Sequence, residues 1–153
     1  MLRCATRLAP ALVLALFAWT GLAQTAHAQS EWEDQVRAQL DLVLTFAETV
    51  GWQRTHDFFI GSLRDDESDT FTGDFEEGWE YRVVSFCDDD CSDIDLYLTD
   101  ENGNEIDEDV STNRVPIIEC EPAWTGEFSI RVRMYECAVE PCYFGIGVFG
   151  RRK

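Results

Sequence analysis

The sequence predicts an all-β fold, an antiparallel, jelly-roll-like β-sandwich of about eight strands that is preceded by one N-terminal amphipathic helix. Three observations support this prediction. Apolar residues recur at helical spacing from Glu31 to about Val50. After Trp52 the pattern changes to short runs of alternating apolar and polar residues, and turn residues separate these runs. Short strands with frequent turns are typical of antiparallel sandwiches and jelly rolls, and a barrel is the alternative.

Residues 1–28 have the features of a removable signal peptide. Arg3 and Arg7 make its beginning positive, and an apolar run follows from Ala11 to Leu22. Ala26-His27-Ala28 is a small-x-small cleavage signal. The apolar run is short beside the ~20 apolar residues of a membrane-spanning helix, so a retained anchor is the less favoured alternative. We therefore expect a periplasmic or secreted protein with no membrane insertion after cleavage.

The charge balance limits the partners of the chain. The whole sequence has 12 basic and 30 acidic residues and a formal net charge of −18. Cleavage after Ala28 removes two basic residues and no acidic ones, which leaves a net charge of −20 over 125 residues. This charge excludes nucleic acid, because phosphate binding needs basic residues. It favours cations, basic partners and solubility, and 125 residues are a common size for one domain.

Residues 29–51 are predicted to form the amphipathic helix. Ser30 and Glu33 have the spacing of a capping box, and Gly51 is a stop signal. The apolar positions recur three and four apart, at Trp32, Val36, Leu40, Val43, Leu44, Ala47 and Val50. Such a face usually packs against its own domain. A partner-binding or membrane-surface helix is the alternative, and the acidic opposite face argues against anionic lipid.

Residues 52–150 are predicted to form the sandwich. The expected strands are Thr55–Leu63, Thr70–Phe75, Glu80–Cys87, Ile94–Thr99, Val115–Cys120, Glu127–Met134 and Tyr143–Gly150. Asp100-Glu101-Asn102-Gly103 fits a type I turn whose glycine takes the left-handed position of a hairpin. Arg131 and Arg133 point away from the apolar side of their strand and are expected to pair with carboxylates, a basic docking surface being the alternative. The glycines of the last strand indicate close packing, and residues 151–153 form a basic tail.

Five cysteines follow the predicted cleavage site, and their spacing predicts two local disulfides. In an oxidising compartment we expect Cys87 to pair with Cys91 and Cys137 with Cys142. Neither pair has Cys-x-x-Cys spacing, which disfavours a zinc site or a thioredoxin-like motif. Cys120 is left over, as a buried free thiol or as the partner in an intermolecular bridge.

The loop between Cys87 and Cys91 is a candidate calcium site. A disulfide across it turns the chain and crowds three carboxylates, each pair of which repels by roughly 0.7 to 3 kcal/mol at about 6 Å. Solvent, counterions or a hard cation would offset this repulsion. Calcium takes six to eight oxygen ligands, and the candidate ligands are Asp88, Asp89, Asp90, Asp93 and Asp95. A second acidic group could approach from another loop, namely Asp65, Asp66, Glu67 and Asp69. A hydrated acidic loop without a bound ion is the alternative.

Seven short motifs occur in an order that resembles the bacterial pre-peptidase C-terminal (PPC) domain, over roughly Phe58 to Phe149. They are Gly61-Ser62-Leu63, Asp69-Thr70-Phe71, Gly78-Trp79-Glu80-Tyr81, Asp93-Ile94-Asp95-Leu96-Tyr97-Leu98, Asn102-Gly103, Thr125-Gly126-Glu127-Phe128 and Tyr143-Phe144-Gly145. The resemblance implies a jelly-roll-like sandwich that is usually appended to secreted hydrolases, with roles in secretion, substrate attachment or enzyme stability. Some members bind calcium. This sequence carries no peptidase domain and adds a helix and two cysteine pairs, so an accessory role does not follow directly.

The sequence offers little for catalysis. His56 is the only histidine after the predicted cleavage site, and no nucleophile elbow, zinc-binding histidine pair or phosphate loop is present. We therefore expect a non-catalytic binding or accessory module that contacts a protein or a polysaccharide. The alternatives are a secreted hydrolase with an unrecognised carboxylate site and a structural envelope protein linked through Cys120. Candidate binding anchors, which could equally be core residues, are Trp52, Trp79, Trp124 and Tyr97.

Overall fold

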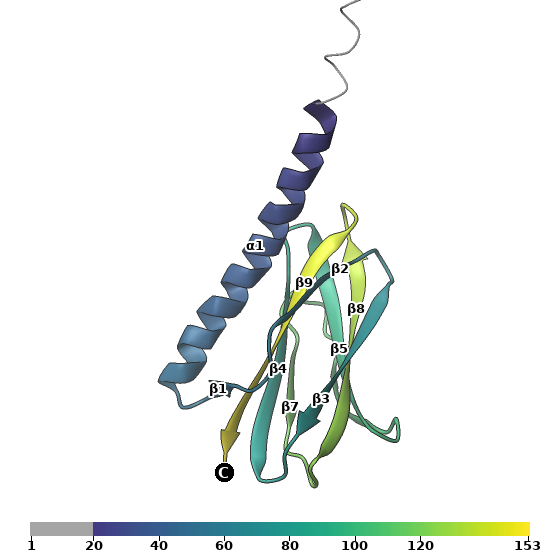
Figure 1. Ribbon diagram of the computed structural model, residues 1–153. Coiled ribbons are helices and arrows are strands. Elements are labelled where there is room, and N and C mark those ends of the chain that lie inside the picture. The colour runs from purple at the N-terminus through teal and green to yellow at the C-terminus, as the bar shows by residue number, and fades with distance from the viewer. Residues whose placement is uncertain (1–19) are drawn as a thin grey trace, which may run out of the picture.

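The computed structural model describes the backbone of residues 20–153 and the side chains from Glu31 onward. One helix, α1 (Thr20–Thr49), runs along one side of a β-sandwich (Figure 1). It begins before the predicted start at residue 29, because the preceding segment contains three alanines, the residue that most favours helix. Ser30 therefore lies inside α1 and does not cap it. Most of the predicted signal peptide, residues 1–19, lies outside the described residues, and the signal peptide stays a prediction.

Within residues 20–153, nine strands form two antiparallel sheets, which confirms the predicted all-β sandwich (Figure 1). In sheet A, β9 pairs with β1 and β2 on one side and with β4 on the other, and β4 also pairs with β7. Its strands are β1 (Gln53–Arg54), β2 (Phe59–Leu63), β4 (Trp79–Cys87), β7 (Ile117–Cys120) and β9 (Cys142–Arg152). Sheet B has the order β3-β8-β5-β6. Its strands are β3 (Ser68–Phe75), β5 (Cys91–Asp100), β6 (Glu105–Asp109) and β8 (Gly126–Cys137).

Two features at strand ends and edges differ from the prediction. The sequence did not predict β6, since its residues Glu105–Asp109 are mostly acidic; it forms as a largely exposed edge strand that pairs only with β5. Arg151 and Arg152, expected in a tail, are the last residues of β9 and pair with Glu80 and Trp79 of β4.

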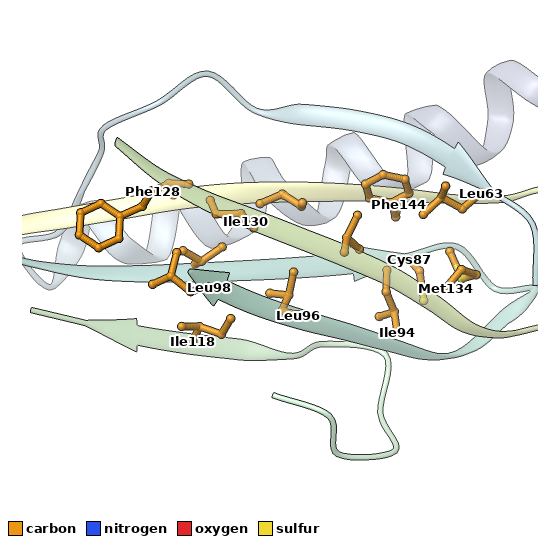
Figure 2. Packing of buried hydrophobic residues seen from close by; sticks show 14 of the residues in the cluster. Leu63, Cys87, Ile94, Leu96, Leu98, Ile118, Phe128, Ile130, Met134 and Phe144 are labelled. Carbon is orange, nitrogen blue, oxygen red and sulfur yellow. The ribbon is translucent and has the colours of Figure 1, made fainter. Parts of the chain in front are cut away.

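The main core lies between the two sheets. Ile94, Leu96 and Leu98 of β5 are fully buried, as their alternation with polar residues predicts. They pack in one cluster with residues of β8, β9, β4 and β7. Figure 2 labels Phe128, Met134, Phe144 and Ile118 among these residues, and Val83 of β4 also belongs to the cluster. This packing fixes the register of each strand, because a shift by one residue would expose its apolar side.

A second layer of packing joins α1 to the outer face of sheet A. Val36 and Leu40 of α1 are fully buried against Gly145 and Gly147 of β9. A Cβ atom at Gly145 would lie 2.5 Å from Val36 Cγ1 and 2.7 Å from Leu40 Cδ1. The two glycines therefore allow α1 to approach β9 closely, which confirms the close packing that they indicate in the sequence. β9 is buried on both faces as a result.

Two aspartates join the sheets along one edge. The backbone N–H of Ile117 in β7 donates to Asp109 Oδ2 of β6 at 2.9 Å, and that of Glu119 donates to Asp107 Oδ2 at 3.1 Å. These N–H groups point away from β4, so without the carboxylates they would be open to pairing with another chain. The acidic side chains of β6 therefore close the edge of β7.

The predicted hairpin turn between β5 and β6 is confirmed. Gly103 has a φ of +79°, and its N–H donates to the Asp100 carbonyl at 3.0 Å. The Asp100 carboxylate accepts from the backbone N–H groups of Asn102 and Asn104 at 2.9 and 2.8 Å, and from the Asn104 side chain at 2.8 Å. The hydrogen bond from the Asn104 side chain is the largest cause that lowers the pKa of Asp100 below its ordinary value of 3.8.

We expect Gly145→Ala to destabilise the protein by about 1–3 kcal/mol, because the added methyl group overpacks the contact between α1 and β9. Val36→Ala removes the nearest atom and should recover part of this loss when both substitutions are combined. Urea unfolding of the two single variants and the double variant measures the coupling. Strictly additive effects, or a Gly145→Ala variant as stable as the wild type, would show that α1 does not pack on this glycine.

We expect Asp100 to contribute stability above pH 3.8 and to lose that contribution as the pH falls below it. The reason is that a carboxyl group with a lowered pKa in the folded state binds protons more weakly there than in the unfolded chain. Asp100→Asn should be less stable than the wild type at pH 6, and the difference in free energy of unfolding should shrink at pH 3. A difference independent of pH would contradict the assignment.

Candidate functional site

An apolar groove lies between α1 and the outer face of sheet A. It has a volume of about 340 Å³, and Arg82 is the only charged residue among the eleven that line it. The helix side includes Val43, Phe46 and Val50, and the sheet side includes Val84, Phe86 and Ile117. Volumes from about 300 Å³ upward are typical of ligand pockets. The groove is therefore large enough to take apolar side chains of a binding partner.

The groove exists because α1 packs on β9 and leaves the neighbouring strands partly uncovered. In β4, Val83 points into the core between the sheets, and Val84 points outward, to the helix side. Ile117 of β7 also points outward, and 49% of its surface is exposed. The outer face of sheet A is thus apolar over a wider area than one helix covers.

An exposed apolar row, Leu42, Phe46 and Val50, runs beside this groove, and we call it the helix row. Phe46 and Val50 line the groove, and Leu42 does not. Leu42 and Phe46 are four residues apart and therefore lie on one side of α1, and Val50 follows in the turn after the helix ends at Thr49. Their exposed fractions are 71%, 67% and 50%. An exposed apolar surface of this kind usually marks an interaction site.

Leu42 and Phe46 were not predicted as functional residues, because they lie beside the apolar face whose spacing predicts the helix. The signal that would have found them is the density of apolar residues from Leu40 to Ala47, where only Asp41 and Thr45 are polar. A helix with one packed face needs fewer apolar residues than this segment contains.

Trp52 lies at one end of the groove and has a structural role. It is 7% exposed, and the guanidinium groups of Arg82 and Arg151 each lie 4.7 Å from its ring centre. Arg82 pairs with Glu119 at 2.6 Å, and Arg151 pairs with Glu80 at 2.6 Å. Trp52 is therefore held in place by two paired arginines and is not a free binding anchor.

The other three predicted anchors also contact residues of their own domain. Tyr97 lies under Arg131, with 3.7 Å between the guanidinium carbon and the ring centre. Trp124 is 37% exposed and donates from Nε1 to Glu101 Oε2 at 3.2 Å. Trp79 stacks on Tyr81, with ring centres 6.1 Å apart. None of these three aromatic residues lines the groove.

Both predicted disulfides are present. Cys87 pairs with Cys91 and Cys137 with Cys142, each with 5.9 Å between the Cα atoms. Cys91 and Cys137 are also partners in the register of β5 and β8, so the two disulfides lie together at one end of the sandwich. Disulfides of this kind indicate an oxidising compartment.

The loop aspartates are bound by protein groups. Asp88 is fully buried, and its Oδ2 accepts from the backbone N–H of Tyr143 at 2.6 Å. Its Oδ1 accepts from the N–H of Asp90 at 3.2 Å. Burial raises the pKa of Asp88, and these amide donors partly offset the rise. Asp89 pairs with Arg114 at 2.9 Å. Backbone amides and one guanidinium thus offset the repulsion that the sequence predicts in this loop.

Asp93 and Asp95 lie farther along and are 4% and 3% exposed. Asp93 Oδ1 accepts from the backbone N–H of Asn113 at 3.1 Å, and Asp95 Oδ2 accepts from the Tyr97 hydroxyl at 3.3 Å. Burial, and then the neighbouring charge of Asp93, raises the pKa of Asp95. Asp93 and Asp95 therefore have different hydrogen-bond partners from the three aspartates of the disulfide loop.

The second acidic group is held in the same way. Asp66 pairs with Arg133 at 2.6 Å, which confirms the expected pairing of that arginine. Asp65 Oδ1 accepts from the N–H of Cys137 at 2.8 Å, and Glu67 Oε2 accepts from the N–H of Arg64 at 2.9 Å. Each of these carboxylates therefore stabilises a turn or a strand end.

Calcium binding stays a prediction. Among residues 31–153, no three His, Cys, Asp or Glu side chains are arranged to hold a metal ion. A calcium-specific rise in melting temperature over chelator, lost in Asp93→Ala, would establish a site.

His56 and Cys120 each lie among other residues of the fold. The His56 ring lies 5.6 Å from that of Phe75, and its Nδ1 shares a 2.9 Å hydrogen bond with the Thr55 hydroxyl. Cys120 has no disulfide partner among the described residues and is 6% exposed. Burial raises the pKa of its thiol to about 11. The thiol is therefore protonated at neutral pH.

Comparisons with known proteins add no family to this description. No protein-family model matches the chain, and no curated protein is significantly similar to it. The resemblance to the PPC domain therefore stays a prediction from the sequence motifs. In the part of the chain from Thr20 onward, no helix has the length and apolar character needed to cross a membrane.

Proposed function

We propose that this chain is an exported, non-catalytic binding module that holds a protein partner in the groove between α1, β4 and β7. The observation that carries this proposal is the exposed helix row, Leu42, Phe46 and Val50, beside an apolar groove of about 340 Å³. Apolar and aromatic anchors in desolvated pockets supply most of the binding energy at protein interfaces. Export to the periplasm or the medium is supported by the two disulfides and the signal-like beginning of the sequence.

The chemistry of the groove favours a protein over a polysaccharide. A sugar presents many hydroxyl groups, and each buried hydroxyl needs a hydrogen-bond partner. Arg82 is the one charged residue of the lining, and the other lining residues have apolar or aromatic side chains. Leucine, valine or phenylalanine side chains from a partner fit this lining without leaving polar groups unpaired.

The same lining favours binding over catalysis. The groove residues are Val, Phe, Ala, Ile, Trp and one Arg, so they supply no carboxylate, imidazole, hydroxyl or thiol. General acid–base and nucleophilic catalysis need such groups within hydrogen-bond reach of the substrate. A role as an accessory module agrees with what the resemblance to the PPC domain implies.

We expect a photo-crosslinking amino acid at position 46 to capture one discrete protein in the cells that export the chain. Phe46 is 67% exposed beside the groove, so the replacement leaves the fold intact. Tyr135 of β8, which is 50% exposed and lies in sheet B, is the matched control position. The product from position 46 should disappear when Ile117→Glu places a charge in the groove.

The cross-link pattern decides the proposal. A product at position 46 that Ile117→Glu removes, with none at position 135, is the expected result. Equal products at both positions, or no product at position 46, would contradict a binding function for the groove. Circular dichroism of Ile117→Glu checks that the variant is folded.

A further inference from the structure

We infer that the open side of the sandwich, between β2 and β3, binds a small amphiphile, namely an alkyl or acyl chain with an uncharged head group rich in hydroxyl groups. β2 lies at the edge of sheet A and β3 at the edge of sheet B. Side-chain hydrogen bonds between β6 and β7 close the opposite side, whereas two adjoining cavities lie on this one. Among the described residues, none lines both these cavities and the groove, so the inference is independent of the proposed function.

The first cavity is apolar and is lined by side chains of the core. Its volume is about 320 Å³. Phe59 and Phe71 line it from the two edge strands, and Ile130, Ile146 and Val148 line it from β8 and β9. An apolar cavity of about 150 Å³ is enough to bind benzene. An alkyl chain fits the larger space without bringing polar groups into it, whereas a peptide segment would bring backbone N–H and C=O groups that need partners.

A bulge in the edge of sheet A produces the opening. Between β1 and β2, residues 55–58 lie opposite only Gly147 and Val148 of β9. The extra residues leave the regular pairing here, and His56 and Asp57 lie at the mouth of the apolar cavity. Bulges are frequent next to active sites, where they redirect a side chain. The local irregularity of β2 therefore places polar groups beside an apolar space.

His56 supplies a hydrogen-bond acceptor at this mouth. The Thr55 hydroxyl donates its one proton to the Val148 carbonyl at 3.2 Å, so it accepts the 2.9 Å hydrogen bond from His56 Nδ1. In the neutral ring, Nε2 then carries the lone pair. Nε2 lies over Gly73, which lines both cavities, and within the described residues it has no hydrogen-bond partner. A ligand hydroxyl group can donate to it.

The second cavity adjoins the first at His56 and is polar, with a volume of about 580 Å³. Arg54 supplies hydrogen-bond donors, and its 3.8 Å ion pair with Asp57 uses only some of them. Asp74 and Glu76 supply acceptors. A hydroxyl group both donates and accepts, so a head group with several hydroxyl groups can pair with this mixed lining. A carboxylate head group would face the two acidic residues, and an ammonium head group would face the arginine.

The test measures binding of octyl glucoside to the purified protein by titration calorimetry, at concentrations below micelle formation. We expect saturable binding at one site that weakens about fourfold for each methylene group removed from the chain, because each buried methylene group contributes to affinity. Octanol has the same chain and glucose the same head group. Each of them alone should bind at least tenfold more weakly, about the difference that one or two lost hydrogen bonds or a lost apolar contact produces.

The head group separates two sources of such a ligand. Octyl glucoside represents a glycolipid, and 1-octanoylglycerol represents an acylglycerol with the same number of carbon atoms in its chain. Binding of either supports the inference, and the tighter of the two identifies the source. Octanoate and octyltrimethylammonium, which have charged head groups on the same chain, should each bind at least tenfold more weakly than the tighter one.

Methyl-resolved nuclear magnetic resonance locates the bound chain. We expect intermolecular nuclear Overhauser contacts from the octyl group to the methyl groups of Ile130, Ile146 and Val148. No contacts are expected to Ile117, which lines the groove.

Three variants test the two parts of the site. Ile130→Phe fills the apolar cavity and should weaken binding of octyl glucoside at least tenfold. Ile106→Phe, the same exchange at a 40% exposed position of β6, is the matched control and should leave binding unchanged. His56→Phe keeps a ring and removes the acceptor, so it should weaken octyl glucoside by roughly threefold to tenfold and leave octanol unaffected. Circular dichroism confirms that each variant is folded.

Three outcomes would overturn the inference. Contacts of the octyl group to Ile117 in place of Ile130, Ile146 and Val148 would place the chain in the groove. A charged analogue that binds as tightly as octyl glucoside would reject the uncharged head group. Absence of binding of octyl glucoside and 1-octanoylglycerol at millimolar concentration would reject an amphiphile as the occupant. The cross-linking at position 46 decides the proposed function separately from each of these results.

Discussion

The contact between α1 and the glycines of β9 determines how the outer face of sheet A is used. Gly145 and Gly147 have no side chains, so Val36 and Leu40 come within van der Waals contact of the strand itself. Fully burying such side chains contributes roughly 1.5–3 kcal/mol each. This contact fixes α1 over β9, one strand away from β4 and two from β7. The groove and the exposed helix row are consequences of that position.

Aspartates provide a second recurring interaction, in which a carboxylate accepts from backbone N–H groups of a distant segment. Asp88 binds the beginning of β9, and Asp107 and Asp109 bind the edge of β7. Asp93 binds the loop before β7 in the same way. Four of the 30 acidic residues in the sequence therefore have a structural use.

The sequence predicts the interactions that are local or periodic. Alternation in β5 predicts its buried face, and the short cysteine spacings predict both disulfides, because neither inference needs a distant residue. Contacts between residues far apart in the chain could not be predicted from the sequence. The partner of Asp88 is Tyr143, 55 residues away, and the acidic strand β6 forms only because β5 is beside it. The groove was missed for the same reason, since the exposure of Phe46 depends on where α1 meets β9.

The most direct test of this account is a nuclear Overhauser measurement on the purified protein with labelled methyl groups and glycines. We expect contacts from the α-protons of Gly145 and Gly147 to the methyl groups of Val36 and Leu40, and none to those of Leu42. This pattern would place α1 on β9 and leave the helix row free. Contacts from Leu42 to either glycine, or an absence of contacts from Val36 and Leu40, would contradict the docking of α1 on β9 and the groove derived from it.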